Sequence, residues 1–495
     1  MQIRIITFIC FIFITQAFCQ NQNSMWIFGD SAGIDFSNIS NPIPIISSMD
    51  GRGSCVSFSD TSGSLWLYAN HNSLAQGKLW NYLNDTLENS DSIIGDGYYG
   101  GLVLIPKPLN DSLFYLFSLK LSGHGLYYNI VNIKHNNGLG IVVQKNILLN
   151  SLDIADCLTA IKHGNGRDWW LIAKFSNSSM HNRFFVYLID SSGISPPIIQ
   201  NFNNATDAGF QKMVFNSKGT KLMQMNLVGL LCEFDFDRCT GLFSNPNEIF
   251  PQIIVAAYFW EGAYSPNDSV FYVSTNFYNG ATYSYLFQFN LYSPNIPMSC
   301  DTLDIFSSPI GTGAVRLAPD GKIYFSRAYE CNAFPYCYPY PDSARNYVNE
   351  NLSVINNPNS VGAACDYQPF SYYLAGKRTY YGLPNNPNYN LGPVIGSICD
   401  TLGLSVRQIT DNLHFQIYPN PIINNILNIE YHLPQNKSGL FLIYDITGKV
   451  VFKYILPQWS NEQSFKLPEL SNGIYNCVIN ADNKRISKKV AVINE

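Results

Sequence analysis

The chain has 495 residues, of which 13% are charged and 14% are aromatic, and its formal net charge is −5 with a pI near 5.8. No basic stripe occurs along the sequence, so nucleic acid is not expected as a partner. With so few charged residues, packing and hydrogen bonds must provide most of the stability. The length suggests more than one domain.

Residues 1–19 have the pattern of a secretory signal peptide. Arg4 gives a weakly positive start, an apolar run follows, and Ala17 and Cys19 occupy the small-residue positions of a cleavage site. Acylation of Cys19 is the alternative, which bulky Phe18 disfavours. The apolar run is too short for a membrane span. The sequence therefore predicts export and no transmembrane segment in the mature chain.

Residues 314–326 read as strand, tight turn, strand. Val315 and Leu317 alternate with Arg316 and Ala318, as in a half-buried strand, and Pro319 and Gly321 suit a turn. The same pattern recurs at residues 58–68, 105–115, 160–171, 214–223 and 263–272. A period of about 50 residues is typical of four-stranded propeller blades.

The predicted fold is therefore all-β, with a propeller over residues 20–384. This length leaves room for six or seven blades, and seven is favoured. Residues 26–28 and 34–36 are not joined by a copy of the recurring hairpin turn. We expect them to complete a blade with strands near residues 372–374. Helical periodicity is nearly absent.

The segments before each first strand are placed to line one mouth of a central channel. They carry small residues together with five larger candidates for ligand binding: Tyr99, Asp156, Asp207, Trp260 and Glu261. An acidic and aromatic ring would suit a sugar or a cation. The favoured alternative is that these residues form a solvated rim and cap strands through hydrogen bonds.

Twelve cysteines occur, and two of them, Cys10 and Cys19, lie in the signal peptide. Two close pairs predict disulfides that close short loops: Cys232 with Cys239, and Cys331 with Cys337. Cys300, Cys365 and Cys399 are further candidates whose connectivity stays open. No metal is expected, because the pairs lack zinc-ligand spacing and nearby histidines.

No catalytic motif was found. The sequence lacks a nucleophile elbow, a zinc-protease helix, a P-loop and a dinucleotide fingerprint. His124 and His163 lie in turns, and Asp235 and Asp237 share one face of a probable strand. No catalytic residue and no cofactor are therefore predicted.

Residues 385–412 are turn-rich and lack a period, which is typical of a linker. About seven short strands then follow over residues 413–495 and predict a small Ig-like β-sandwich. In chain order the landmarks of this part are Tyr418-Pro419-Asn420-Pro421, Asp445 with Gly448-Lys449, Gly473 with Tyr475, and Lys488.

These landmarks resemble the type A sorting domain of the type IX secretion system. The resemblance implies recognition by that machinery and transport across the outer membrane of gliding and related Gram-negative bacteria. It also implies cleavage near the start of the domain, followed by release or attachment to surface lipopolysaccharide. The preceding part is similar to WD-repeat-like propellers of exported proteins, on residues 26–36, 158–170 and 317–324.

The leading hypothesis is thus a secreted or surface-attached, non-catalytic propeller that binds a glycan or a protein partner in adhesion. One alternative is a secreted hydrolase or lyase that uses Asp156, Asp207 or Glu261 at the channel mouth. Another is a purely structural surface subunit.

Overall fold

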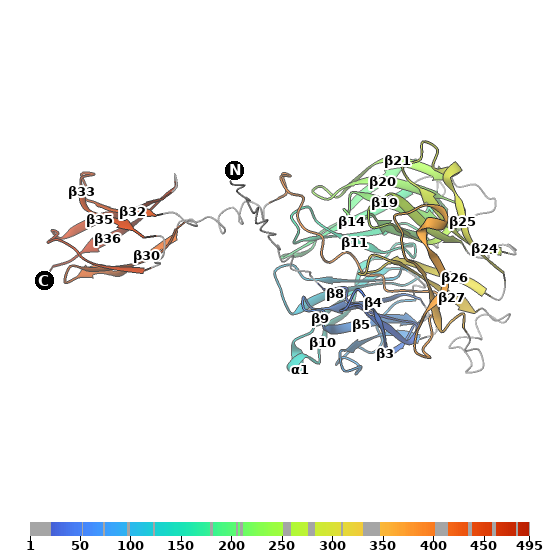
Figure 1. Ribbon diagram of the computed structural model, residues 1–495. Coiled ribbons are helices and arrows are strands. Elements are labelled where there is room, and N and C mark those ends of the chain that lie inside the picture. Colours follow the sequence, from blue (N-terminus) through green and yellow to red (C-terminus); the bar gives the residue numbers. More distant parts are fainter. Residues whose placement is uncertain are drawn as a thin grey trace, which may run out of the picture. The chain divides into compact units, whose positions relative to one another are not determined.

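The computed structural model describes residues 21–494 except 52, 73–74, 97–99, 122–123, 179–181, 204–205, 208–210, 251–258, 276–282, 308–309, 330–346, 401–413, 434–437, 458–461 and 482–483. The predicted signal peptide, Tyr99, Cys331 and Cys337 lie outside the described residues. The chain divides into two compact units at Cys399 and Asp400 (Figure 1). In the described part of the chain, no helix has the length and apolar character needed to cross a membrane.

The first unit is a seven-bladed propeller, as favoured from the sequence. Blade 1 contains β1 (Met25–Phe28), β2 (Asp30–Asp35) and β3 (Ile43–Asp50), and blade 2 contains β4 (Cys55–Ser59), β5 (Leu65–Asn72) and β6 (Ala75–Asn81). Blade 3 contains β7 (Leu102–Pro106), β8 (Leu113–Leu119), β9 (Leu126–Asn132) and β10 (Ile141–Asn150). Blade 4 contains β11 (Thr159–Lys162), β12 (Trp169–Lys174), β14 (Asn182–Asp190), β15 (Gly193–Ile194) and β16 (Ile198–Phe202).

The remaining three blades have four strands each. Blade 5 contains β18 (Gln211–Phe215), β19 (Lys221–Asn226), β20 (Leu231–Asp237) and β21 (Leu242–Phe250). Blade 6 contains β22 (Phe259–Tyr264), β23 (Val270–Thr275), β24 (Tyr283–Asn290) and β25 (Asp301–Ser307). Blade 7 contains β26 (Ile310–Leu317), β27 (Ile323–Tyr329), β28 (Asn351–Ile355) and β29 (Tyr367–Tyr373). The short elements are α1 (His135–Gly138), β13 (Asn177–Ser178), β17 (Thr206–Asp207), η1 (Pro297–Ser299) and η3 (Gly362–Cys365).

Each recurring hairpin of the sequence joins the first two strands of one blade, from blade 2 to blade 7. The turns share one device: a side-chain oxygen of Asp or Asn accepts hydrogen bonds from backbone N–H groups two to five residues further on. The accepting residues are Asp60, Asn110, Asn165, Asn216, Asn267 and Asp320. This local bond explains why Asp and Asn mark the repeat.

The ring closes by packing between blades 1 and 7. The rings of Trp26, Phe36 and Tyr324 meet edge to face, with centroids 5.1 to 6.0 Å apart. The predicted closure was different and is wrong, because β29 is the outer strand of blade 7 and does not complete blade 1. The aromatic seam and one antiparallel bridge between Asp30 and Arg378 take the place of that strand pairing.

The second unit is one seven-stranded arrangement in the order β33-β32-β35-β36-β30-β31-β34. The strands are β30 (His414–Ile423), β31 (Ile426–His432), β32 (Gly439–Tyr444), β33 (Val450–Leu456), β34 (Glu462–Lys466), β35 (Gly473–Ala481) and β36 (Lys484–Val492). Phe441 and Phe465 stack at 5.4 Å inside it. This unit matches the predicted small sandwich.

Two of the landmark motifs hold this second unit together. The Oδ1 atom of Asp445 accepts hydrogen bonds from the backbone N–H groups of Thr447 (2.9 Å) and Lys449 (3.0 Å), which shapes the turn between β32 and β33. The side chain of Asn420 in β30 accepts from the N–H of Ala491 at 3.0 Å in β36. The asparagine between the two prolines therefore joins two strands.

One buried histidine makes the stability of the propeller depend on pH. His71 in β5 is 1% exposed, and among the described residues neither ring nitrogen has a hydrogen-bond partner. It packs so tightly that a Cβ added at Gly95 would lie 1.8 Å from its Cε1 atom. Burial lowers the pKa of His71 to about 3, although the nearby Asp96 carboxylate opposes this shift.

We expect Trp26→Ala to lower the free energy of unfolding by about 3–5 kcal/mol, because it empties the seam that closes the ring. Urea unfolding followed by fluorescence measures this change. Tyr292→Ala, at a side chain that is 75% exposed, is the control. Equal stabilities for the two variants would show that the seam does not hold the ring closed.

Acidification should destabilise the propeller through His71. Below the ordinary pKa of 6.5, the unfolded chain binds a proton that the native chain does not, so stability falls as the pH falls from 6.5 toward 3. Between pH 7.5 and pH 5, wild type should lose about 2 kcal/mol more than His71→Leu. An identical pH dependence of the two proteins in urea unfolding would contradict this assignment.

Candidate functional site

The inner strands of the propeller are contacted by a later segment of the chain. After β29 the chain returns to the ring, and residues 378–399, called the strap, run through it. At one end the backbone N–H of Asp30 in blade 1 donates to the carbonyl oxygen of Arg378 at 2.9 Å. Next, the carbonyl oxygen of Tyr381 accepts from the N–H of Ala314 at 2.7 Å and from the hydroxyl of Ser326 at 2.8 Å, both in blade 7. Residues 385–399, assigned to the linker by composition, thus lie within the first compact unit.

Asn385 lies where several blades converge. Its backbone N–H donates to the carbonyl oxygen of Cys55 at 2.8 Å. Its side-chain Nδ2 donates to the carbonyl oxygens of Leu102 at 2.9 Å and Leu158 at 3.0 Å. One residue of the strap therefore satisfies backbone carbonyls at the inner edges of blades 2, 3 and 4.

The strap continues along blades 2 to 4 and ends at a disulfide. The hydroxyl of Tyr389 donates to the carbonyl oxygen of Leu104 at 2.9 Å, and Arg238 donates to the carbonyl oxygen of Gly392 at 2.6 Å. Cys399 is then bonded to Cys239, which lies 160 residues earlier in the chain. The end of the strap is thereby fixed to blade 5.

The predicted Cys232–Cys239 disulfide is wrong. Cys232 lies in β20 with its side chain in the same apolar core as Phe234 and Phe236. Cys239 lies beyond the end of that strand and bonds to Cys399. The short sequence distance was misleading because the strand directs the first thiol into the core.

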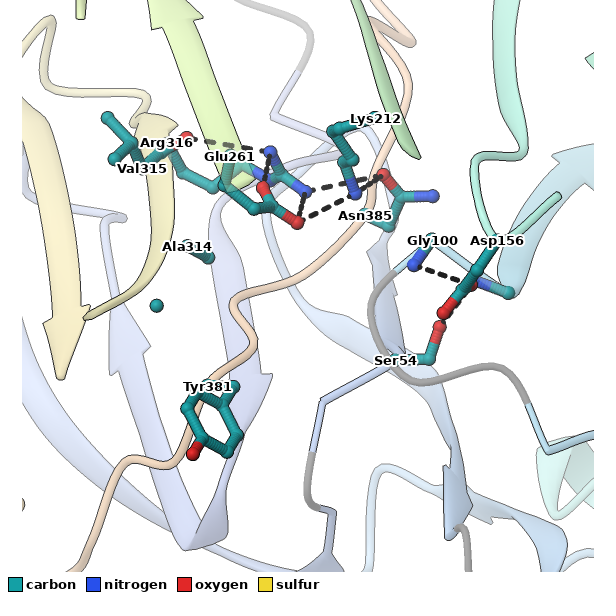
Figure 2. A network of polar contacts seen from close by, with 12 residues as sticks. Ser54, Gly100, Asp156, Lys212, Glu261, Ala314, Val315, Arg316, Tyr381 and Asn385 are labelled. Carbon is teal, nitrogen blue, oxygen red and sulfur yellow. Dashed lines mark hydrogen bonds and ion pairs between the residues drawn. The ribbon is translucent and has the colours of Figure 1, made fainter. Parts of the chain in front are cut away.

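A buried ionic cluster surrounds the side chain of Asn385 (Figure 2). Glu261 in β22 pairs with Lys212 in β18 at 3.0 Å and with Arg316 in β26 at 2.7 Å. The exposed fractions of these side chains are 1% for Glu261, 2% for Lys212 and 11% for Arg316. The Oδ1 atom of Asn385 accepts from Lys212 Nζ at 3.3 Å and from Arg316 at 3.4 Å. Three blades and the strap thus meet in one polar network.

The electrostatics of this network follow from its burial. Burial lowers the pKa of Lys212, and the neighbouring Arg316 guanidinium lowers it further, while the Glu261 carboxylate acts in the opposite direction. Burial also raises the pKa of the nearby Cys55 thiol to about 12, so this thiol stays protonated at neutral pH. The cluster therefore combines a lysine whose ammonium gives up its proton more readily than in water with a glutamate and a guanidinium.

The structure places the predicted channel residues in different surroundings. Asp156 is 1% exposed, accepts from the N–H of Gly100 at 3.0 Å, and lies beside Ser54 in Figure 2. Glu261 belongs to the ionic cluster, and Trp260 packs near Tyr381 with ring centroids 6.3 Å apart. Asp207 lies in β17, whose backbone pairs with β13. The ligand-binding role of these residues stays a prediction.

An opening lies at the other end of the first strands, where the Asp/Asn turns are. It is a cavity of about 540 Å³ between the first strands of blades 4 to 7, the start of the chain and the strap. Its wall contains seven asparagines: Asn21, Asn23, Asn216, Asn385, Asn386, Asn388 and Asn390. Among the described residues that line it, Arg316 is the only charged one.

The sequence reasoning missed the strap and two members of the ionic cluster. One signal was available: Lys212, Glu261 and Arg316 are each the one charged residue of a first strand. A charged residue at the inner edge of a blade points toward the axis, so three such strands indicate a polar centre. The strap gave no comparable signal, because its Asn and Pro residues resemble those of a linker.

Peptide mapping without reductant should find Cys239 linked to Cys399. Cys399→Ser should lower the free energy of unfolding by about 2–4 kcal/mol, because the long loop between the two cysteines is no longer closed in the unfolded chain. Cys300→Ser, at an exposed cysteine outside this bond, is the matched control. Recovery of a Cys232–Cys239 peptide would overturn the assignment.

Comparisons with known proteins give one family match and several structural likenesses. Residues 416–493 match the secretion system C-terminal sorting domain. No curated protein matches the chain. A periplasmic gluconolactonase from Pseudomonas aeruginosa has 11% identity and a TM-score of 0.33, over 84% of this chain and 95% of that one. An auxiliary nutrient binding protein from Bacteroides thetaiotaomicron has 11% identity and a TM-score of 0.34, over 56% and 67%.

A GH43 protein from Bacillus licheniformis has 10% identity and a TM-score of 0.31, over 79% of this chain and 87% of that one. At such scores these likenesses carry no argument about what the propeller does. The family match does identify the second unit: the chain carries a type IX C-terminal sorting domain and is secreted or attached to the outer surface of a Bacteroidetes-type Gram-negative bacterium by that machinery.

Proposed function

We propose that the exported propeller is a non-catalytic binding module that takes a neutral glycan in the asparagine-lined cavity and thereby acts in adhesion. The observation that carries this proposal is the composition of the wall, which combines many amides with apolar and aromatic side chains. Among the described lining residues there is no Asp, Glu or His. Apart from Arg316, such a wall offers its hydrogen bonds from uncharged groups.

Sugar hydroxyls need both donors and acceptors, and an asparagine amide provides both. Asn388 and Asn390 of the strap are exposed and line the cavity, so their amides are accessible to a ligand. Phe215 is partly exposed in the same wall and supplies apolar surface for the carbon face of a sugar, whereas Phe36 and Tyr264 line the wall as buried rings. The cavity volume suits one or two sugar units.

The hydrolase alternative finds less support. Carboxylate hydrolysis of a glycosidic bond needs two carboxyl groups that flank the substrate. Asp156 and Glu261 are each 1% exposed and already engaged, by the Gly100 N–H and by the two cations respectively. Neither residue lines the cavity. These contacts favour binding over catalysis.

A glycan array of neutral oligosaccharides, probed with the protein as its host secretes it, tests this function. The double variant Asn388→Ala/Asn390→Ala should bind about 5- to 150-fold more weakly, because each of the two lost hydrogen bonds contributes about 0.5–1.5 kcal/mol. Asn357→Ala, at an exposed asparagine of blade 7 outside the cavity wall, should bind like wild type.

Binding that is unchanged in the double variant would exclude this cavity as the site. Turnover of a bound glycan that disappears in Glu261→Gln would favour the hydrolase alternative instead. If the protein binds no neutral glycan but does bind an outer-membrane protein, a protein partner would be favoured.

A further inference from the structure

We propose that Lys212 and Asn385 become joined by an intramolecular isopeptide bond, with Glu261 as the proton-transferring residue. This inference is independent of the glycan-binding proposal. It rests on three side chains from two blades and the strap that meet in the buried ionic cluster (Figure 2).

The lysine amine already contacts the amide group whose carbon it would attack. Lys212 Nζ lies 3.3 Å from Oδ1 of Asn385. The lysine side chain is 2% exposed, so water has little access to the pair. Two groups held in such an arrangement react at a high effective concentration, because the fold has already removed their translational freedom. No binding step is needed, since both groups belong to the same folded chain.

The amide of Asn385 is held in an orientation that suits attack on its carbon. Its Nδ2 donates to the carbonyl oxygens of Leu102 at 2.9 Å and Leu158 at 3.0 Å, which fixes the plane of the amide. Its Oδ1 accepts from the Arg316 guanidinium at 3.4 Å. When the amine attacks, negative charge develops on this oxygen, and a fixed cation beside it stabilises that charge.

Glu261 is placed to move the protons. Its carboxylate lies 3.0 Å from Lys212 Nζ and is 1% exposed. Burial lowers the pKa of Lys212, and the cationic Arg316 adds to this effect, so a neutral amine is more accessible than in water. Transfer of one proton from the ammonium to the carboxylate leaves a neutral, nucleophilic amine beside a carboxylic acid.

The reaction balances without an external reagent. Glu261 takes one proton from the Nζ ammonium, and the lone pair so freed forms a bond to Cγ of Asn385. The second Nζ proton passes to Nδ2 within the tetrahedral intermediate, the Cγ–Nδ2 bond breaks, and ammonia leaves. The proton held by Glu261 then passes to this ammonia. Overall, an ammonium and a primary amide give a secondary amide and an ammonium ion, and no atom is oxidised or reduced. The carboxylate of Glu261 is regenerated.

The bond would fasten the strap to blade 5 inside the ring. Together with Cys239–Cys399 it would tie the strap at two points, the second of which is independent of redox conditions. A protein that works outside the cell gains from a covalent tie that reductants do not break.

Mass spectrometry of the wild-type protein secreted by its host tests the proposal directly, once terminal peptides have fixed where the secreted chain begins and ends. After reduction, its intact mass should be about 17 Da, the mass of one ammonia, below the value expected for the sequence between those termini. After trypsin, one branched peptide should connect Lys212 with Asn385, and cleavage after Lys212 should be absent. Normal cleavage after Lys212, with an intact mass equal to the sequence mass, would overturn the proposal and leave an ionic cluster only.

Variants separate the roles of the three residues. Glu261→Gln should abolish the mass loss, because no group remains to move the protons, and Lys212→Met should abolish it as well. Lys174→Met, at the other fully buried lysine among the described residues, is the matched control and should keep it. Asn385→Asp should form the same bond with loss of water, about 18 Da, which shows that the site is intact even if other variants misfold. A mass loss that persists in Lys212→Met would contradict the assignment.

Discussion

The hydrogen bonds between the strap and the inner strands are the interaction on which the centre of the propeller depends. Seven inner strands converge on one axis and bring backbone carbonyls and charged side chains together where water is scarce. Buried polar groups must find partners, because an unsatisfied one costs about 1–3 kcal/mol. Asn385 donates hydrogen bonds to backbone carbonyls of blades 2, 3 and 4. It also accepts hydrogen bonds from Lys212 of blade 5 and Arg316 of blade 7.

The charge distribution supports the same view. Only 13% of the residues are charged, yet three of these residues meet around one asparagine in the centre of the propeller. An ion pair in such a place is a weak source of stability, since desolvation offsets most of the attraction. The ion pairs can instead fix the relative positions of blades 5, 6 and 7, because the Glu261 carboxylate must lie between the cations of the other two blades. Under this interpretation the cluster sets how those blades meet.

Local patterns were readable from the sequence, and contacts across the ring were not. The six hairpins were found because each depends on an Asp or Asn that bonds to its own turn, as Asp60 and Asn216 do. The sorting domain was found because its motifs are local, as in the Asp445 turn. The partner of Cys239 was missed, because it lies 160 residues away and only the path of the strap brings it near. The cavity was missed for the same reason, since its wall joins residues 21–39 to residues 385–390.

The strap also makes the cavity depend on both ends of the propeller. Asn21 and Asn23 come from the first residues after the predicted signal peptide, and Asn388 and Asn390 come from the last residues before the disulfide. A chain interrupted anywhere before residue 385 would lack one wall. The cavity therefore forms only when the whole propeller has been synthesised. A fragment that lacks either end of the propeller cannot bind a ligand there.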